Sequence, residues 1–100
     1  MPQNLNTRLR VETGEQVFQH ELLQEQAISL GRQGARLEGA LASLKAHEGG
    51  DDDRAALVRE AADAAWCFFV QRDVMGLRDR AAVIAQYGIP REVLNRIGAR

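Results

Sequence analysis

Residues 14–47, GEQVFQHELLQEQAISLGRQGARLEGALASLKAH, decide the fold of this chain. The stretch contains no proline and is rich in Leu, Ala, Glu, Gln and Arg, all of which favour the α-helix. Thr13 and Gln16 fit a capping box, in which both side chains satisfy free backbone N–H groups at a helix start. Gly49 and Gly50 are typical of a helix end. The sequence therefore predicts one helix over 14–47.

A heptad pattern runs along this predicted helix. One line repeats leucine every seven residues, and a second line carries mostly small residues, which let a partner backbone come close. Such a close approach would give Gly34 a packing role, although a glycine inside a helix costs about 1 kcal/mol relative to alanine. We predict that these two lines form an interface with another helix. They consist of Leu23, Leu30, Leu37 and Leu44, and of His20, Ala27, Gly34 and Leu41.

A second helix is predicted over 53–75. One of the three aspartates at 51–53 would cap it, and all three favour the positive N-terminal end of a helix. Its apolar residues, Trp66 among them, cover a wide arc, which is typical of a mostly buried helix. Taken alone, the apolar residues 66–70 would also fit a β-strand, but the alanine-rich residues before them favour the helix.

Two short helices complete the chain, over 80–87 and 90–97. Asp79 would cap the first and Gly88 would end it, and Pro90 suits the first turn of the second. We therefore expect an all-α helical bundle, in which the long helix pairs with a buried second helix and the two short helices cap that pair. Residues 1–12 would be a flexible N-terminal arm, and residues 13–100 a single helical domain.

The composition indicates an ordinary folded protein. The chain has 100 residues, of which 45% are hydrophobic and 27% charged, and a formal net charge of −1. These values exclude wholesale disorder, and they give no overall attraction to nucleic acid or to an anionic membrane. Cys67 is the only cysteine, the N-terminus lacks an apolar signal segment, and no stretch is apolar enough to span a membrane. We expect a cytoplasmic protein that does not bind membranes.

The length of the first helix predicts self-association. A helix over 14–47 would be about 51 Å long, whereas a compact chain of this size measures roughly 34 Å across. Part of the leucine line would then face water unless a second copy covered it around a two-fold axis. The alternative is a helix bent at Gly31, Gly34 or Gly39, which would fold back on the second helix as a monomeric bundle.

Few residues suggest chemistry. The sequence has no nucleophile elbow, phosphate-binding loop or metalloprotease motif, so we expect no enzyme and no cofactor. We predict that Cys67 is a buried structural residue, because no histidine lies near it on its helix. His20 and His47 are too far apart for a shared metal, and the aspartates at 51–53 lack the alternating pattern of a calcium loop. These features favour a protein that associates with itself or with another protein.

An alternative function is nucleic-acid binding. Residues 79–98 have the outline of a helix-turn-helix, and the arginines near them could contact phosphates or another anion. Against this, Ile84 stands where such motifs usually have alanine, and Trp66 and Tyr87 do not alternate with basic residues. We do not favour it. The arginines concerned are Arg72, Arg78, Arg80, Arg91 and Arg96.

Three blocks of the sequence resemble a family of small bacterial proteins known as a domain of unknown function. They are LGRQGARLEGALASL at 30–44, FFVQRDVMGLRD at 68–79 and YGIPREVLNRIG at 87–98. The likeness extends over most of the chain after about residue 15. It implies a small all-helical domain, and it implies no activity and no functional residues.

Overall fold

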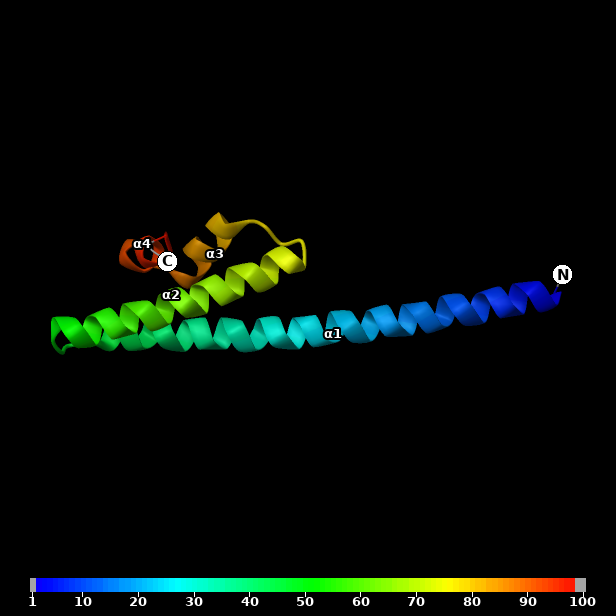
Figure 1. Cartoon of the computed structure of the whole chain (residues 1–100), viewed down its shortest axis with the longest axis horizontal. Coiled ribbons are helices and arrows are strands. Elements are labelled where there is room, and N and C mark those ends of the chain that lie inside the picture. The colour runs from blue at the N-terminus through cyan, green and yellow to red at the C-terminus, as the bar shows by residue number, and fades with distance from the viewer. Residues whose placement is uncertain (1, 99–100) are drawn as a thin grey trace.

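The computed structural model describes the backbone of residues 2–98 and the side chains of residues 14–98. Within this range the chain forms helices and no strand, which confirms the predicted all-α fold (Figure 1). The helices are α1 Pro2–Ala46, α2 Asp51–Val74, α3 Arg80–Tyr87 and α4 Arg91–Gly98.

The first helix is longer than the sequence pattern predicts. It begins at Pro2, so the predicted start at Thr13 is wrong and residues 2–12 belong to the helix instead of lying outside it. The side chain of Thr13 lies outside the described residues. Proline at the first position of a helix is favourable, because its fixed φ suits the helix and its missing N–H needs no partner there. α1 is also unbroken at all of its internal glycines, so the predicted alternative of a bent helix is not found.

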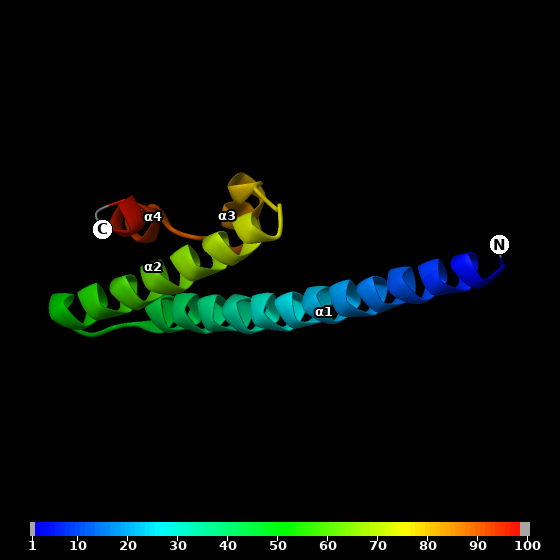
Figure 2. The ribbon, with the colours of Figure 1, turned by 45° about the vertical axis from the view of Figure 1, so that its right-hand side comes forward.

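The molecule is a rod with a small bundle at one end. It measures 74 × 22 × 19 Å, and its radius of gyration is 20.1 Å, whereas a compact chain of this length has a value of about 13 Å. Figures 1 and 2 show why: α1 continues far beyond the end of α2, and no other described helix accompanies it there. We call residues 2–26 of α1 the projecting segment.

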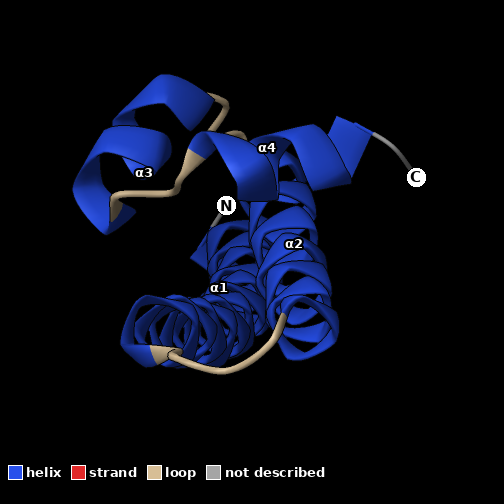
Figure 3. Ribbon diagram, turned by 90° about the vertical axis from the view of Figure 1, so that its left-hand side faces the viewer, coloured by secondary structure: helices blue, strands red, loops and turns tan. Residues whose placement is uncertain are grey.

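The core lies where α2 packs against α1 and α4. Viewed along the rod, α2 has α1 on one side and α4 on another (Figure 3). Alanines make up much of the buried face of α2, and their small side chains let the helices approach closely. The buried core residues are Leu37, Leu44, Ala61, Ala62, Ala64, Ala65, Phe68, Phe69, Val83, Ile89 and Val93.

The connections between helices follow the predictions in part. Asp79 caps α3 as predicted, since its carboxylate accepts a hydrogen bond of 3.1 Å from the backbone N–H of Ala82. Gly88 ends α3 with a φ of 65°, a value that suits glycine because it has no Cβ. The predicted aspartate cap of α2 is wrong. Gly50 occupies that position without a side-chain hydrogen bond, and the three aspartates lie inside the first turn, where their charges still favour the helix dipole.

α2 is less buried than its composition predicts. Trp66 and Cys67 are both exposed, so the predicted buried tryptophan and buried cysteine are wrong. The reason is geometric, because α1 and α4 cover only part of the circumference of α2 and a residue outside that arc meets water whatever its hydrophobicity. None of the described helices contains a segment that is both long and apolar enough to cross a membrane.

Candidate functional site

The burial of the leucine line differs from one end of α1 to the other. Leu37 and Leu44 are 0% and 3% exposed and belong to the core with α2. Leu30 is half-buried at the edge of that core. Leu23, on the same heptad line, is 59% exposed in the projecting segment. One end of the predicted interface therefore packs against the chain's own α2, and the other end is exposed.

Other apolar side chains of the projecting segment are also exposed. Val17, Phe18 and Leu22 are exposed by 48–67%, and Ile28 is exposed just beyond the segment. Phe18 lies five residues before Leu23, which is about 140° around the helix, so these side chains point to more than one side. A helix that is apolar on several sides is typical of a helix enclosed by neighbours.

The small-residue line is used within the chain. A Cβ on Gly34 would lie 2.9 Å from Tyr87 Oη and 3.3 Å from Phe68 Cε1. The rings of Tyr87 and Phe68 pack edge to face, with centroids 5.3 Å apart. The close approach that the sequence predicts at Gly34 is therefore filled by side chains of this chain, while Ala27 remains exposed and Leu41 half-buried.

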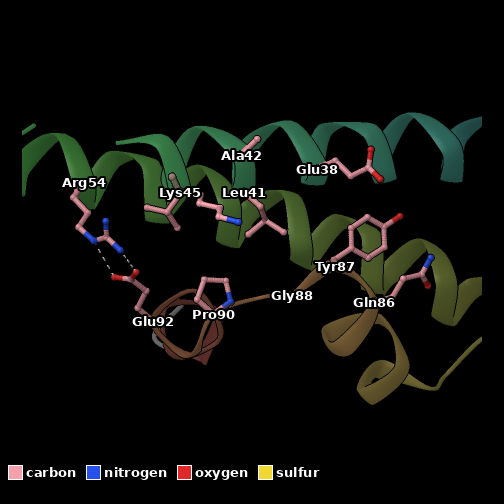
Figure 4. Close-up of a pocket in the computed structure, with 11 residues that line it drawn as sticks. Glu38, Leu41, Ala42, Lys45, Arg54, Gln86, Tyr87, Gly88, Pro90 and Glu92 are labelled. Atoms are coloured by element: carbon pink, nitrogen blue, oxygen red, sulfur yellow. Dashed lines mark hydrogen bonds and ion pairs between the residues drawn. The ribbon is translucent and has the colours of Figure 1, made fainter. Parts of the chain in front are cut away.

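An open groove of about 670 Å³ follows α1 beside α3 and α4 (Figure 4). Glu38, Leu41 and Lys45 line it from α1, and Tyr87 and Pro90 line it from the opposite side. An ion pair between Arg54 and Glu92 lies at one end and joins α2 to α4. The described residues contain no group of three or more His, Cys, Asp or Glu side chains placed to hold a metal ion.

A second exposed apolar surface lies on α2. Trp66, Val70 and Val74 follow one another at intervals of four residues, and Leu77 continues the patch into the next loop. Val74 is 68% exposed, and the other three are exposed by 38–43%. We call these four residues the Trp66 surface. Because the buried residues of α2 lie on the opposite arc, this surface points away from the core.

Arg80 borders the Trp66 surface. Its guanidinium carbon lies 5.9 Å from the centroid of the Trp66 ring and 5.1 Å from that of Phe69. Its Nη2 also donates to Asp73 Oδ2 at 2.7 Å. Cation–π contacts of this kind stabilise by about 0.5–1 kcal/mol at exposed sites. Arg80 therefore holds α3 against α2.

The five arginines predicted as possible anion or nucleic-acid contacts do not share one environment. Arg72 stacks on Phe68 with 5.8 Å between its guanidinium carbon and the ring centroid, and Arg80 is engaged as described. Arg78 is exposed in the loop before α3. Arg91 and Arg96 are exposed on α4. Two of the five thus stack on aromatic rings of α2, and the other three are exposed.

Cys67 lies beside an ion pair instead of a catalytic base. Arg36 Nη1 is 3.9 Å from Cys67 Sγ, and Arg36 Nη2 is 2.9 Å from Glu60 Oε1. The hydrogen bond to Glu60 is the main reason why the pKa of Arg36 is raised. His20 is exposed on the projecting segment, and His47 Nε2 lies 3.2 Å from the carbonyl oxygen of Gly50. The structure therefore places neither histidine beside the thiol.

Comparison with known proteins identifies the family. A family model described as "Family of unknown function (DUF6665)" matches residues 3–100. The chain belongs to this family. The predicted resemblance is thereby confirmed, together with the helical fold that it implied, and the bacterial origin stays a prediction. No curated protein and no solved structure matches the chain.

Sequence reasoning missed two parts of the surface of this DUF6665 chain. It did not single out Val17 and Phe18, which lie off the heptad lines, and it assigned Trp66 and Val70 to the core. One signal was present: large apolar residues recur four residues apart on α2, while the alanines lie on another arc. Two apolar faces on one helix indicate two neighbours.

Proposed function

We propose that this DUF6665 chain is a non-catalytic association module, in which the projecting segment of α1 packs against a second copy of the chain. The observation that carries the proposal is the exposure of Val17, Phe18, Leu22 and Leu23 on one bare stretch of helix. Large apolar patches on a monomer surface typically mark interaction sites. A second copy is the simplest partner, because a two-fold axis covers both projecting segments at once.

Helix stability supports the same proposal. No other described helix lies beside the projecting segment (Figure 1), and most helical stability in proteins comes from tertiary packing of an apolar face. Its apolar side chains would stabilise it only after burial, and complete burial of each is worth about 1.5–3 kcal/mol. Association would thus supply both the burial and the helix stability that the isolated chain lacks.

Multi-angle light scattering on a sizing column tests the proposal. We expect a mass near twice 11.1 kDa at high micromolar concentration. The double variant Leu22→Glu/Leu23→Glu should be monomeric, because it would place two charges in the buried interface. The matched double variant Gln19→Glu/Gln24→Glu adds the same charge at polar positions of the same segment and should weaken association far less. A mass near 11 kDa for the unmodified chain at every concentration would refute the proposal.

Nucleic-acid binding by residues 79–98 stays a prediction without a structural observation in its favour. Arg80 is committed to Asp73 and to the aromatic rings, and Arg72 is stacked on Phe68. The remaining basic side chains of this region are few for a phosphate-binding face, since the electrostatic part of binding comes from Lys and Arg that neutralise phosphates. Self-association is therefore the function that we retain.

A further inference from the structure

We propose that, in this dimer, the projecting segment of each copy packs along the Trp66 surface of the other copy. This inference rests on the proposed self-association and names the surface that receives the projecting segment. The occupant is a second copy of this chain, and the contact occurs twice, once on each side of the two-fold axis.

The distribution of exposed apolar residues is the first argument. All large hydrophobic side chains that are exposed among residues 14–98 lie in two places: on α1 from Val17 to Ile28, and on the Trp66 surface. The two places cannot cover each other within one chain, because the projecting segment extends beyond the end of α2 and the Trp66 surface points away from the core (Figure 1). Each copy therefore offers two unpartnered surfaces, and a two-fold dimer can satisfy both.

The lengths of the two helices agree. The projecting segment has 25 residues and α2 has 24, so each is about 36–38 Å long. If the two α2 helices meet end to end near the axis, each α1 extends past its own α2 and along the α2 of its partner. The arrangement is closed, and it leaves neither projecting segment uncovered.

The same arrangement brings the apolar residues to matching positions. Both the projecting segment and the partner's α2 would run toward the axis, ending at Gln26 and Val74 respectively. Phe18 lies eight residues before Gln26, as Trp66 lies eight residues before Val74. Leu22 and Val70 each lie four residues before the same ends. Phe18 would therefore lie beside the partner's Trp66, and Leu22 would lie beside the partner's Val70.

Intrinsic fluorescence reports directly on this surface, because Trp66 is the only tryptophan of the chain. We expect the emission of the full chain to shift to shorter wavelength as concentration rises, in step with the dimer fraction measured by light scattering. Val70→Glu should raise the dimer dissociation constant at least about tenfold, which corresponds to 1.4 kcal/mol. Ser43→Glu, on an exposed position of α1 outside both surfaces, is the matched control and should leave the dissociation constant unchanged.

The outcomes separate this inference from the proposed function. If the chain dimerises while the emission of Trp66 stays constant and Val70→Glu dimerises like the unmodified chain, self-association holds and this inference is refuted. If the chain is monomeric at all concentrations, both are refuted. Circular dichroism verifies that Val70→Glu is folded. Should it unfold, Val74→Glu decides, because that side chain is 68% exposed and contributes little to the core.

Discussion

The two halves of α1 have similar helix-forming sequences and different surroundings. Residues 30–46 pack on α2 and bury Leu37 and Leu44, whereas the projecting segment carries Leu23 in the open. Leu23 of the projecting segment lies on the same heptad line as Leu37 and Leu44 of the packed half. The comparison shows that a heptad pattern specifies a helix with an apolar face. The position of the next helix decides which part of that face is buried within the chain.

The largest expected difference between the halves is in amide hydrogen exchange. At concentrations low enough to keep the chain monomeric, amides of the projecting segment should exchange through local opening at almost no free-energy cost. Amides of residues 37–44 should require opening close to global unfolding, about 5–15 kcal/mol for a typical domain. Mass spectrometry of exchanged peptides measures both. Equal protection of the two halves in the monomer would show that their surroundings do not differ. Protection of the projecting segment that rises with protein concentration would show that association covers this half alone.

Truncation of leucines on the shared line should give the next largest effect. Leu37→Ala removes a side chain that is 0% exposed, so the free energy of unfolding should fall by about 2–5 kcal/mol. Leu23→Ala, on the same line, should change the unfolding free energy of the monomer by no more than about 0.5 kcal/mol. Urea denaturation at low protein concentration measures both values. Similar losses for the two variants would mean that the projecting half has a partner within the monomer.

The smallest expected effect concerns glycines in the two halves. A Cβ on Gly34 would approach Tyr87 Oη to 2.9 Å, so Gly34→Ala should cost about 1 kcal/mol after its gain in helix propensity. Gly14 in the projecting segment has nothing within 4 Å, so Gly14→Ala should increase helix content and favour the segment locally by about 1 kcal/mol. Urea denaturation measures the first change and far-ultraviolet circular dichroism the second. A gain in stability from Gly34→Ala would contradict the close packing of Tyr87 on α1.

Much of the fold was predictable because it depends on local patterns. The second to fourth helices occur within one or two residues of the positions that their caps, glycines and prolines predict, and Asp79 caps α3 as expected. The start of α1 was not predictable from the Thr13 capping box, since a capping sequence inside a longer helix does not end it. Residues 2–12, which were predicted to precede the first helix, continue it instead.

The candidate site was predictable only in part. Leu23 stands among the predicted interface residues and is exposed, whereas Leu37 and Leu44, predicted on the same terms, belong to the core. Trp66 was assigned to the core because a large apolar residue is usually buried. Whether it is buried depends on which arc of α2 the other helices occupy. The spacing within α2 indicates two apolar faces, and it does not indicate which of them α1 and α4 cover.

The sequence by itself determined that this chain is helical, that its first helix is too long for a compact domain, and that leucines recur along one side of it. These properties follow from propensity, capping and periodicity, which act between residues close in the chain. Only the tertiary structure decided where α2 ends along α1 and which arc of α2 remains bare. Those facts depend on the packing of helices distant in sequence, and they left apolar side chains of the projecting segment and of the Trp66 surface exposed.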